Sequence, residues 1–394
     1  MAGQYSCTDY CRSTPDLENE TKSTMTFSLI IIILIYCILL MLLNIGWAIN
    51  KQTPSFQGEI SQYYSIVIPF RNEQDNLHNL LWSIQKQSFP GNAYEVILVN
   101  DHSNDSSVEI IKEFEQKASF SLTLLHLEEV LGKKQALAKG ILTSKGSVIV
   151  TTDADCTFGA NWLWSIAAFY EDSDAQMVTG PVTFEKESTF FEKLQTIEFA
   201  SLIGTGAASL ALKMPNMCNG ANLSFRKSSF FEVEGYKGNE EIASGDDEFL
   251  MHKFWEAYGG KVYFNKSKDS TVYTQAHQTW RGFFQQRKRW ASKWKHYSSI
   301  KTTLLAVFVL LFNLSFIMAI GLLLRGVGNY IDLLVVVTLK VILEAIFLYK
   351  VLNFLNKKMN WMYFIFLQFT YPFYVIIFGI AANFGKYRWK GRKH

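Results

Sequence analysis

The sequence lacks a strong net charge. Its 38 lysines and arginines are nearly balanced by 35 aspartates and glutamates, which leaves +3 over 394 residues. Proteins that bind nucleic acids usually carry a larger positive excess, gathered on one face. We therefore expect no nucleic acid among the partners of this chain.

Cysteine is also scarce, and two common nucleotide-binding motifs are absent. The five cysteines, which form no C-x-x-C pair, are Cys7, Cys11, Cys37, Cys156 and Cys218. This distribution is typical of reduced thiols in a domain facing the cytosol, with a Cys7–Cys11 disulfide as the alternative if the N-terminus lies outside. Neither G-x-x-x-x-G-K-[ST] nor G-x-G-x-x-G occurs, so no P-loop or dinucleotide fingerprint is present.

Hydrophobic residues make up 49% of the chain and gather at its two ends. Blocks 27–49 and 302–324 carry no charge and are long enough to cross a bilayer. Blocks 332–355 and 362–384 are also apolar, although the first contains Lys340, Glu344 and Lys350 and the second contains Pro372. We predict a leader (1–26), a transmembrane anchor (27–49), a polar domain (57–300), a membrane region of two to three spans (302–384) and a basic tail (385–394).

Within the polar domain, strand-like and helix-like segments alternate. Apolar runs at 63–70, 94–99, 121–127 and 147–152 predict strands, and amphipathic segments follow the first three. This alternation indicates an α/β fold with a mainly parallel sheet and right-handed crossovers. Polar side chains then collect at one edge of the sheet, and they are Arg71, Glu73, Asp101, Lys133, Asp153 and Asp155.

Asp153 and Asp155 are two carboxylates one residue apart at the end of a buried strand. In an extended backbone they point the same way, and their mutual repulsion favours a cation between them. Oxygen-only ligands suit Mg²⁺ or Mn²⁺, shared with the phosphates of a nucleotide. The alternative is a solvated turn.

Two further segments carry candidate chemistry. Asp246 and Asp247 precede a helix, where they either cap it or supply a general base. The stretch 280–297 is rich in Trp, Phe, Lys and Arg, as interfacial helices are. Within it, Gln286, Arg289 and Trp290 form a Q-x-x-R-W pattern, in which the arginine suits a diphosphate and the tryptophan a sugar ring. The low-polarity segment 188–213 predicts a helix that lies either on the bilayer surface or in the core.

The chain resembles family 2 glycosyltransferases of the GT-A fold, in the membrane-embedded branch that includes cellulose, chitin and hyaluronan synthases and ceramide glucosyltransferase. The motifs that carry the resemblance are, in order, Pro69-Phe70-Arg71-Asn72-Glu73, Asp101, Gly132-Lys133, Asp153-Ala154-Asp155, Gly220-Ala221-Asn222, Asp246-Asp247 and Gln286-Arg287-Lys288-Arg289-Trp290. Each motif alone is weak, and the ordered set is specific.

The resemblance implies a hexosyltransferase-type enzyme that uses a nucleotide-diphospho-sugar donor, most often UDP-linked, and inverts the anomeric carbon in one displacement. It assigns donor binding to Arg71, Glu73, Asp101, Lys133, Asp153, Gln286 and Arg289, a divalent metal (Mg²⁺ or Mn²⁺) to Asp153 and Asp155, catalysis to Asp247, and the acceptor side to Asp246 and Trp290. No enzyme nucleophile is needed, which agrees with the absence of a Ser-His-Asp or Cys-His arrangement.

Three functions stay open at this point. The first is transfer of a sugar to a lipid or to a lipid-linked or glycan acceptor. The second is a small processive polysaccharide synthase, although the chain has fewer hydrophobic blocks than polymer-exporting synthases usually carry. The third is a non-enzymatic membrane protein that binds a nucleotide-sugar or a glycan. Replacement of Asp247 separates the third from the other two.

We expect an integral protein of the cell (inner) membrane. An enzyme that uses a nucleotide-sugar should face the cytosol, and Lys51, Arg71 and the basic run 281–295 support that side for the catalytic domain. Three full spans after the domain would then put the basic tail outside, against the positive-inside rule. We therefore expect one of the last three blocks to be re-entrant or interfacial, with a break at Pro372. Lys340 and Glu344 lie one helical turn apart, so we expect them to pair inside the bundle.

Overall fold

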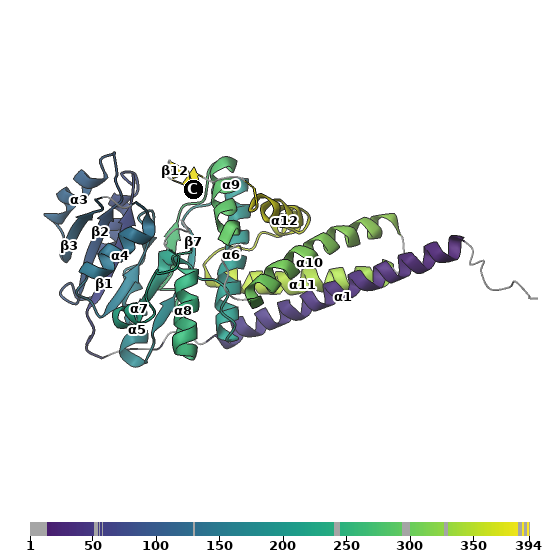
Figure 1. The fold of residues 1–394 in the computed structure, drawn as a ribbon, viewed down its shortest axis with the longest axis horizontal. Helices are drawn as coiled ribbons and strands as arrows, with labels where there is room; N and C mark the ends of the chain where they lie inside the picture. Colours follow the sequence, from purple (N-terminus) through teal and green to yellow (C-terminus); the bar gives the residue numbers. More distant parts are fainter. Residues whose placement is uncertain are drawn as a thin grey trace, which may run out of the picture.

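The structure is a computed structural model that describes residues 14–50, 54, 56, 58–128, 131–239, 245–293, 300–326, 330–384, 388–389 and 392–393. A domain of strands and helices lies at one end of the elongated molecule, and a bundle of long helices lies at the other (Figure 1). The predictions for Cys7 and Cys11 fall outside the described residues.

The α/β domain is built on a seven-stranded sheet. Its strands, in spatial order, are β3 (Ser121–His126), β2 (Tyr94–Asn100), β1 (Tyr64–Phe70), β4 (Val148–Thr151), β8 (Leu223–Arg226), β6 (Met177–Thr179) and β9 (Val262–Phe264). Four of the six strand pairs are parallel, and β8 runs antiparallel to both of its neighbours. The predicted α/β fold with a mainly parallel sheet is confirmed.

The central strands β1 and β2 are buried along their whole length, as continuous apolar runs predict for parallel strands. Proline is unusual in such a strand because it cannot donate a hydrogen bond to the ladder. Pro69 is tolerated because the pairing of β1 with β4 ends earlier, at Val67 and Thr151. Beyond this point β1 has only β2 as a partner, so the sheet opens between β1 and β4.

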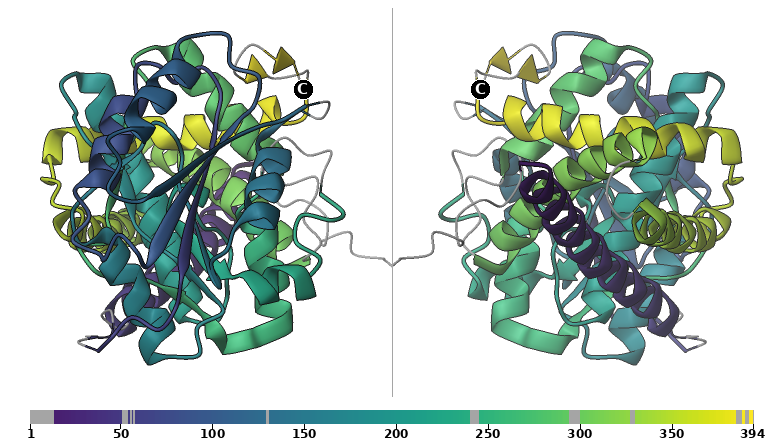
Figure 2. Two further views of the ribbon diagram at one scale, coloured as in Figure 1. Left: turned by 90° about the vertical axis from the view of Figure 1, so that its left-hand side faces the viewer. Right: turned by 90° about the vertical axis from the view of Figure 1, so that its right-hand side faces the viewer.

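Helices cover both faces of this sheet (Figure 2). Ile97 and Val99 of β2 pack with Ala136, whereas Val96 and Leu98 belong to the main core on the other face. Side chains alternate along a strand, so successive residues of β2 meet different helices. The helices of the domain are α2 (Leu77–Gln85), α3 (Ser107–Glu115), α4 (Lys133–Thr143), α5 (Trp162–Asp172), α7 (Lys227–Glu232) and α8 (Glu248–Tyr258).

A smaller sheet and two helices join this domain to the long helices. The sheet contains β5 (Thr157–Phe158), β10 (Val272–Thr274) and β7 (Val182–Phe184), and the helices are α6 (Phe190–Ala211) and α9 (Trp280–Ala291). α6 is buried along most of its length and contacts α1, α11 and α12, which agrees with the core alternative for this segment. A short hairpin of β11 (Arg388–Trp389) and β12 (Arg392–Lys393) contacts α9.

The long helices are α1 (Thr14–Ile49), α10 (Ile300–Arg325), α11 (Tyr330–Phe354) and α12 (Trp361–Ala381). Among the described residues, three segments are long and apolar enough to cross a membrane: Ser23–Ile49, Thr302–Arg325 and Trp361–Ala381. The chain is therefore a membrane protein. In Figure 1, α1, α10 and α11 run lengthwise, whereas α12 is seen almost end-on and so lies across them. The predicted break at Pro372 is wrong, because α12 runs through this residue.

The predicted pair in the bundle is confirmed, because Lys340 Nζ lies 2.8 Å from Glu344 Oε2. Gln368 of α12 accepts a hydrogen bond from Lys340 and donates one to Glu344. Tyr36 of α1 donates to Glu344 Oε1 over 3.0 Å. These four side chains form hydrogen bonds with one another in a region where lipid offers none, and these bonds connect α1, α11 and α12.

Candidate active site

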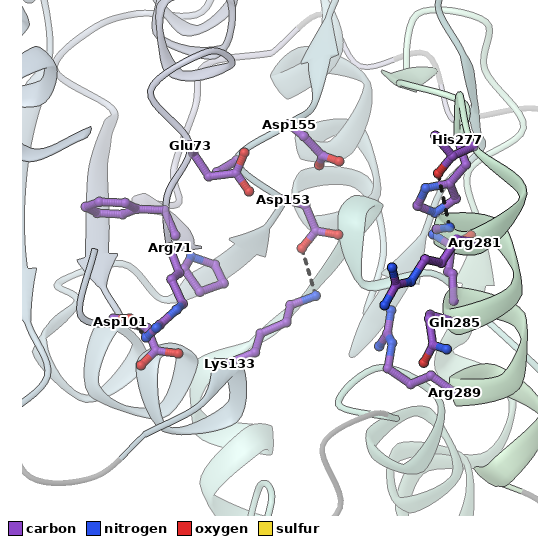
Figure 3. A pocket seen from close by; sticks show the side chains of 16 residues that line it. Arg71, Glu73, Asp101, Lys133, Asp153, Asp155, His277, Arg281, Gln285 and Arg289 are labelled. Carbon is purple, nitrogen blue, oxygen red and sulfur yellow. Dashed lines mark hydrogen bonds and ion pairs between the residues drawn. The ribbon is translucent and has the colours of Figure 1, made fainter. Parts of the chain in front are cut away.

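A cavity of about 510 Å³ lies where the carboxyl ends of β1 and β4 separate. This is the usual position for a ligand in an open α/β sheet, and the volume suits a small ligand. Two walls of opposite charge face each other across it (Figure 3). The acidic wall contains Glu73, Asp101, Asp153 and Asp155 beside two cations, Arg71 and Lys133, so it is negative on balance, and the α9 wall contains His277, Arg281, Gln285, Gln286 and Arg289.

Asp101 directly follows β2 and is 2% exposed. Its main-chain carbonyl accepts a hydrogen bond from Arg71 Nη1 over 3.0 Å, and its carboxylate lies 3.3 Å from His102 Nδ1. His102 takes a positive φ of 58°, which turns the chain sharply at the end of the strand. The side chains after β1 and β2 are thereby held at one edge of the cavity.

Asp155 follows β4, and its Oδ2 accepts a hydrogen bond from the Thr274 hydroxyl over 3.2 Å. Burial, reinforced by the neighbouring charge of Asp153, raises the pKa of Asp155 above its ordinary value. This is the behaviour of two carboxylates that crowd a site suited to a cation.

Lys133 connects the acidic wall to a second pair of acids. Its Nζ lies 2.7 Å from Asp153 Oδ1 and 3.1 Å from Asp246 Oδ2. Gly132 before it has a φ of 120°, a conformation that glycine adopts far more readily than other residues. Burial alone would raise the pKa of Asp246, but the Lys133 ammonium, together with Lys293 and a main-chain hydrogen bond, outweighs it, so this pKa is lowered.

Asp247 follows Asp246, the acid that pairs with Lys133, and does not line the cavity. It caps α8, with Oδ1 accepting from the Glu248 amide over 2.7 Å. Its Oδ2 accepts from the Gly220 amide over 3.0 Å, and Lys293 Nζ lies 3.6 Å from Oδ1. A Cβ atom on Gly220 would lie 3.2 Å from Asp246 Oδ2, so a larger residue there would press on the acid pair.

The α9 wall is formed by one face of a helix. Thr279 caps α9 by accepting from the Gly282 amide over 3.2 Å. Arg281, Gln285 and Arg289 follow at intervals of four residues and therefore share a face. Burial, with help from Arg287, lowers the pKa of His277, which lies just before this helix.

Eight of the predicted site residues line this one cavity, and three do not. Those that line it are Arg71, Glu73, Asp101, Lys133, Asp153, Asp155, Gln286 and Arg289. Asp246 is joined to the group through Lys133, Asp247 lies beside it, and Trp290 packs 6.1 Å from the Phe199 ring. The role of each residue stays a prediction.

The sequence interpretation missed His277, Thr279, Arg281 and Gln285, which also line the cavity. A signal for two of them was present, because Arg281 and Gln285 continue the four-residue spacing that ends at Arg289. No sequence pattern marked His277 or Thr279, since both lie in the irregular segment between β10 and α9.

The residues present fit a divalent cation that is shared with a ligand. In the described part of the chain, no group of three or more His, Cys, Asp or Glu side chains is arranged to hold a metal alone. Mg²⁺ and related ions commonly use one or two carboxylates and complete their coordination with phosphate oxygens and water. Asp153 and Asp155 lining an open cavity match that pattern.

Comparison with known proteins finds similar curated proteins. The chain is 27% identical over 257 residues to a poly-beta-1,6-N-acetyl-D-glucosamine synthase of Staphylococcus epidermidis, covering 63% of this chain and 60% of that protein. It is 25% identical over 278 residues to the synthase of the same name from Staphylococcus aureus, covering 68% of this chain and 65% of that one. The chain thus spans less than two thirds of the length of these relatives.

A solved structure shares the fold over nearly the whole chain. The mannosyltransferase PcManGT from Pyrobaculum calidifontis, in complex with GDP-Man and Mn²⁺, aligns with a TM-score of 0.59 and 15% identity. The alignment covers 92% of this chain and 97% of that one, so the fold is GT-A. Residues 65–231 match the family model for glycosyl transferase family 2. The α/β domain of this chain is therefore similar to family 2 glycosyltransferase domains over this segment.

Proposed function

We propose that this chain is a membrane-bound inverting glycosyltransferase that moves a sugar from a nucleotide-diphospho-sugar, UDP-linked, to a glycan or lipid acceptor. The observation that carries the proposal is the cavity with two oppositely charged walls. A nucleotide-diphospho-sugar needs both, because its diphosphate is anionic whereas its ribose and sugar hydroxyls are donors to carboxylates.

Each wall has a distinct task in this proposal. On the acidic wall, Asp101 and Glu73 accept hydrogen bonds from the nucleoside. On the α9 wall, Arg281 and Arg289 take the diphosphate, where their fixed positive charge stabilises the leaving group as the sugar–phosphate bond breaks. Asp153 and Asp155 would hold Mg²⁺ or Mn²⁺, which neutralises charge on the phosphate oxygens when bound.

Asp247 is the proposed general base. The acceptor hydroxyl oxygen attacks the anomeric carbon, the bond from that carbon to the diphosphate oxygen breaks, and the hydroxyl proton passes to Asp247. The two main-chain donors on Asp247 fix its direction, and a carboxylate keeps further lone pairs for an acceptor hydroxyl. Lys133 links this acid pair to Asp153, so the donor and acceptor sides are in electrostatic contact.

We further propose that α1, α10 and α11 cross the membrane and that α12 lies in its cytosolic surface. Lys357, just after α11, pairs with Glu187 of the catalytic domain at 3.1 Å, which supports a return of the chain to the domain's side. Near the start of α12, Tyr363 packs 5.0 Å from Phe190, and near its end, Phe378 packs 5.0 Å from Phe284 of α9. A helix with both ends against the same domain does not cross.

The exposed side of α12 is also suited to lipid. Large apolar side chains recur on it at intervals of about four residues, at Ile365, Phe369, Phe373 and Ile377. With α12 in the cytosolic surface, the basic tail stays on the cytosolic side, in agreement with the positive-inside rule. This arrangement removes the conflict that three full spans after the domain would create.

A processive polysaccharide synthase is the second candidate, and one finding favours it. The relatives named above are synthases of an N-acetylglucosamine polymer. The site chemistry is the same for one transfer or for many, so the product distinguishes the two candidates.

The experiment is incubation of the purified full-length protein, in lipid nanodiscs with Mn²⁺, with a panel of radiolabelled UDP-sugars that includes UDP-N-acetylglucosamine. We expect UDP release and label in either an organic-soluble lipid or a ladder of repeats. Label in short products supports single transfer, and a ladder supports the processive candidate. Binding of a UDP-sugar without transfer to any acceptor, unchanged by Asp247→Asn, would support a non-enzymatic binding protein instead.

A further inference from the structure

Arg287 lies in the middle of α9 but belongs to neither wall of the cavity. It is 3% exposed, and its side chain points into the junction of α6, α9 and α12. Its Nε donates to Glu198 Oε1 over 3.2 Å, and Nη2 donates to the second carboxylate oxygen. A bidentate pair of this kind fixes both the position and the plane of the guanidinium.

Three further contacts hold this pair in place. The guanidinium lies 4.6 Å from the centre of the Phe283 ring and 4.3 Å from that of Trp290. Tyr374 of α12 donates its hydroxyl to Glu198 Oε1 over 3.0 Å. The buried charge is thus paired, stacked and hydrogen-bonded, as a charge in an apolar setting requires.

The remaining arm of the guanidinium reaches the cavity wall. Nη1 donates to the side-chain oxygen of Gln286, which lines the cavity. A guanidinium has donors and no acceptor, so the amide atom that faces it has to be the oxygen. The other half of the Gln286 amide, its NH₂ group, carries donors only. His277, which hydrogen-bonds the Gln286 side chain, confines it further.

We propose that Arg287 is a positioning residue that turns the Gln286 amide so that its NH₂ group is offered to the diphosphate of the donor. The inference rests on the proposed nucleotide-diphospho-sugar donor and identifies its diphosphate as the group that Gln286 contacts. Phosphate oxygens accept hydrogen bonds and do not donate them, and the neighbouring Arg289 is also a donor without an acceptor. At this point the wall therefore offers two donors side by side, the Gln286 NH₂ group and Arg289, and these favour an anionic group over a neutral hydroxyl.

The first test compares two substitutions at Gln286 and measures UDP affinity by calorimetry with Mn²⁺ on the full-length protein. Gln286→Ala removes the amide, and we expect UDP to bind about tenfold more weakly, the loss of one hydrogen bond to a charged group. Gln286→Glu keeps a partner for Arg287 but turns a carboxylate oxygen toward the cavity. We expect a larger loss than for alanine, with uridine affinity changed less than about twofold in both variants.

The second test is a double-mutant cycle. Arg287→Lys keeps the charge toward Glu198 but loses the fork that reaches Gln286, so UDP affinity should fall about fivefold to tenfold. In a Gln286→Ala background the same change should cost less than about twofold, because the residue through which Arg287 acts is gone. Lys288→Gln, the next residue along α9 and outside the cavity lining, is the matched control and should leave UDP affinity unchanged.

Two results would overturn the inference while leaving the proposed function intact. One is a Gln286→Glu variant that binds UDP as well as the alanine variant or better. The other is an Arg287→Lys effect that is equal in both backgrounds or equally large for uridine, because a purely structural role predicts both. If Arg287→Lys fails to fold, the comparison of Gln286→Glu with Gln286→Ala still tests the inference, because both variants leave the buried pair of Arg287 and Glu198 intact. A wild-type protein that binds no UDP would remove the proposed function and this inference with it.

Discussion

The main-chain N–H of Gly220 donates to Asp247 Oδ2 over 3.0 Å, and this bond joins the turn before β8 to the start of α8. It orients the Asp247 carboxylate, the proposed base, and leaves lone pairs on that carboxylate that can accept a proton. We expect Asp247→Asn to lower kcat at least about 100-fold, the usual contribution of a general base. The melting temperature should fall modestly, because asparagine has one acceptor oxygen and can keep only one of the two main-chain bonds, from Glu248 or from Gly220.

The matched control is Asp174→Asn. Asp174 is an exposed acid whose carboxylate lies 2.8 Å from Lys261, and it does not line the cavity. The kcat of Asp174→Asn should equal that of the wild type. Full activity of Asp247→Asn beside an unchanged control would contradict the assignment of the base.

Lys133 should affect metal and nucleotide binding in opposite directions. Its ammonium lies 2.7 Å from Asp153, so in the absence of nucleotide it competes with a metal ion for that carboxylate. We expect Lys133→Gln to bind Mn²⁺ alone more tightly, by up to about tenfold, and to bind UDP with Mn²⁺ more weakly. Lys133→Arg, which keeps the charge, should behave nearly as the wild type does. Both affinities can be measured by calorimetry, and a loss of both in Lys133→Gln would indicate a purely structural lysine.

Asp155→Asn should stabilise the metal-free protein at neutral pH. Because the pKa of Asp155 is raised, the folded state binds this proton more tightly than the unfolded state does. The resulting stability is full below the usual pKa of aspartate and is lost as the pH rises through the raised value. Asparagine removes this loss while still accepting from Thr274. We expect a melting temperature about 2 °C higher at pH 7 and a smaller difference at pH 4.

The same variant should lose the stabilisation that Mn²⁺ with UDP gives to the wild type. Thermal melts with and without both ligands measure this. A variant that melts below the wild type at pH 7 without metal, or that keeps the full ligand-induced shift, would count against the crowded carboxylate pair as a cation site.

The two ends of α12 should be accessible from the same side of the membrane. In a cysteine-free background, we expect Lys358→Cys and Asn383→Cys to react with a membrane-impermeant maleimide only in inside-out vesicles or after permeabilisation. Asn92→Cys in the catalytic domain is the reference and should give the same pattern. Labelling of Asn383→Cys from the outer side alone would mean that α12 crosses the membrane.

The chemistry of the site was more predictable from the sequence than its geometry. Asp153 and Asp155 could be found because a buried apolar strand and the parallel-sheet rule put both at a ligand edge. Arg287 could not be found in this way, because the sequence of α9 predicts an amphipathic interfacial helix regardless of which of its cations point inward. Contacts from α6 and α12, which are distant in sequence, turn Arg287 into the junction and leave Arg289 at the cavity.

Trp290 illustrates the same limit. Its position in the Q-x-x-R-W pattern predicts an acceptor-lining ring, and this stays a prediction, but the pattern gave no sign that the indole packs against Phe199 and Arg287. The order of motifs along the chain reports which side chains belong to the site. It does not report the rotation of a helix about its own axis, which is set by packing across three separate elements.

The hydrogen bond from Tyr374 to Glu198 has a practical consequence for anyone who wants the catalytic domain without its membrane part. A fragment that ends before residue 300 would retain every motif and the whole segment that matches the family model, yet it would lose the hydrogen bond from Tyr374 to Glu198, the partner of Arg287 in α9. Such a fragment would be a poor choice for crystallisation or inhibitor screening. A better one would fuse α12 back onto the domain through a short linker, so that Tyr374 returns to its partner.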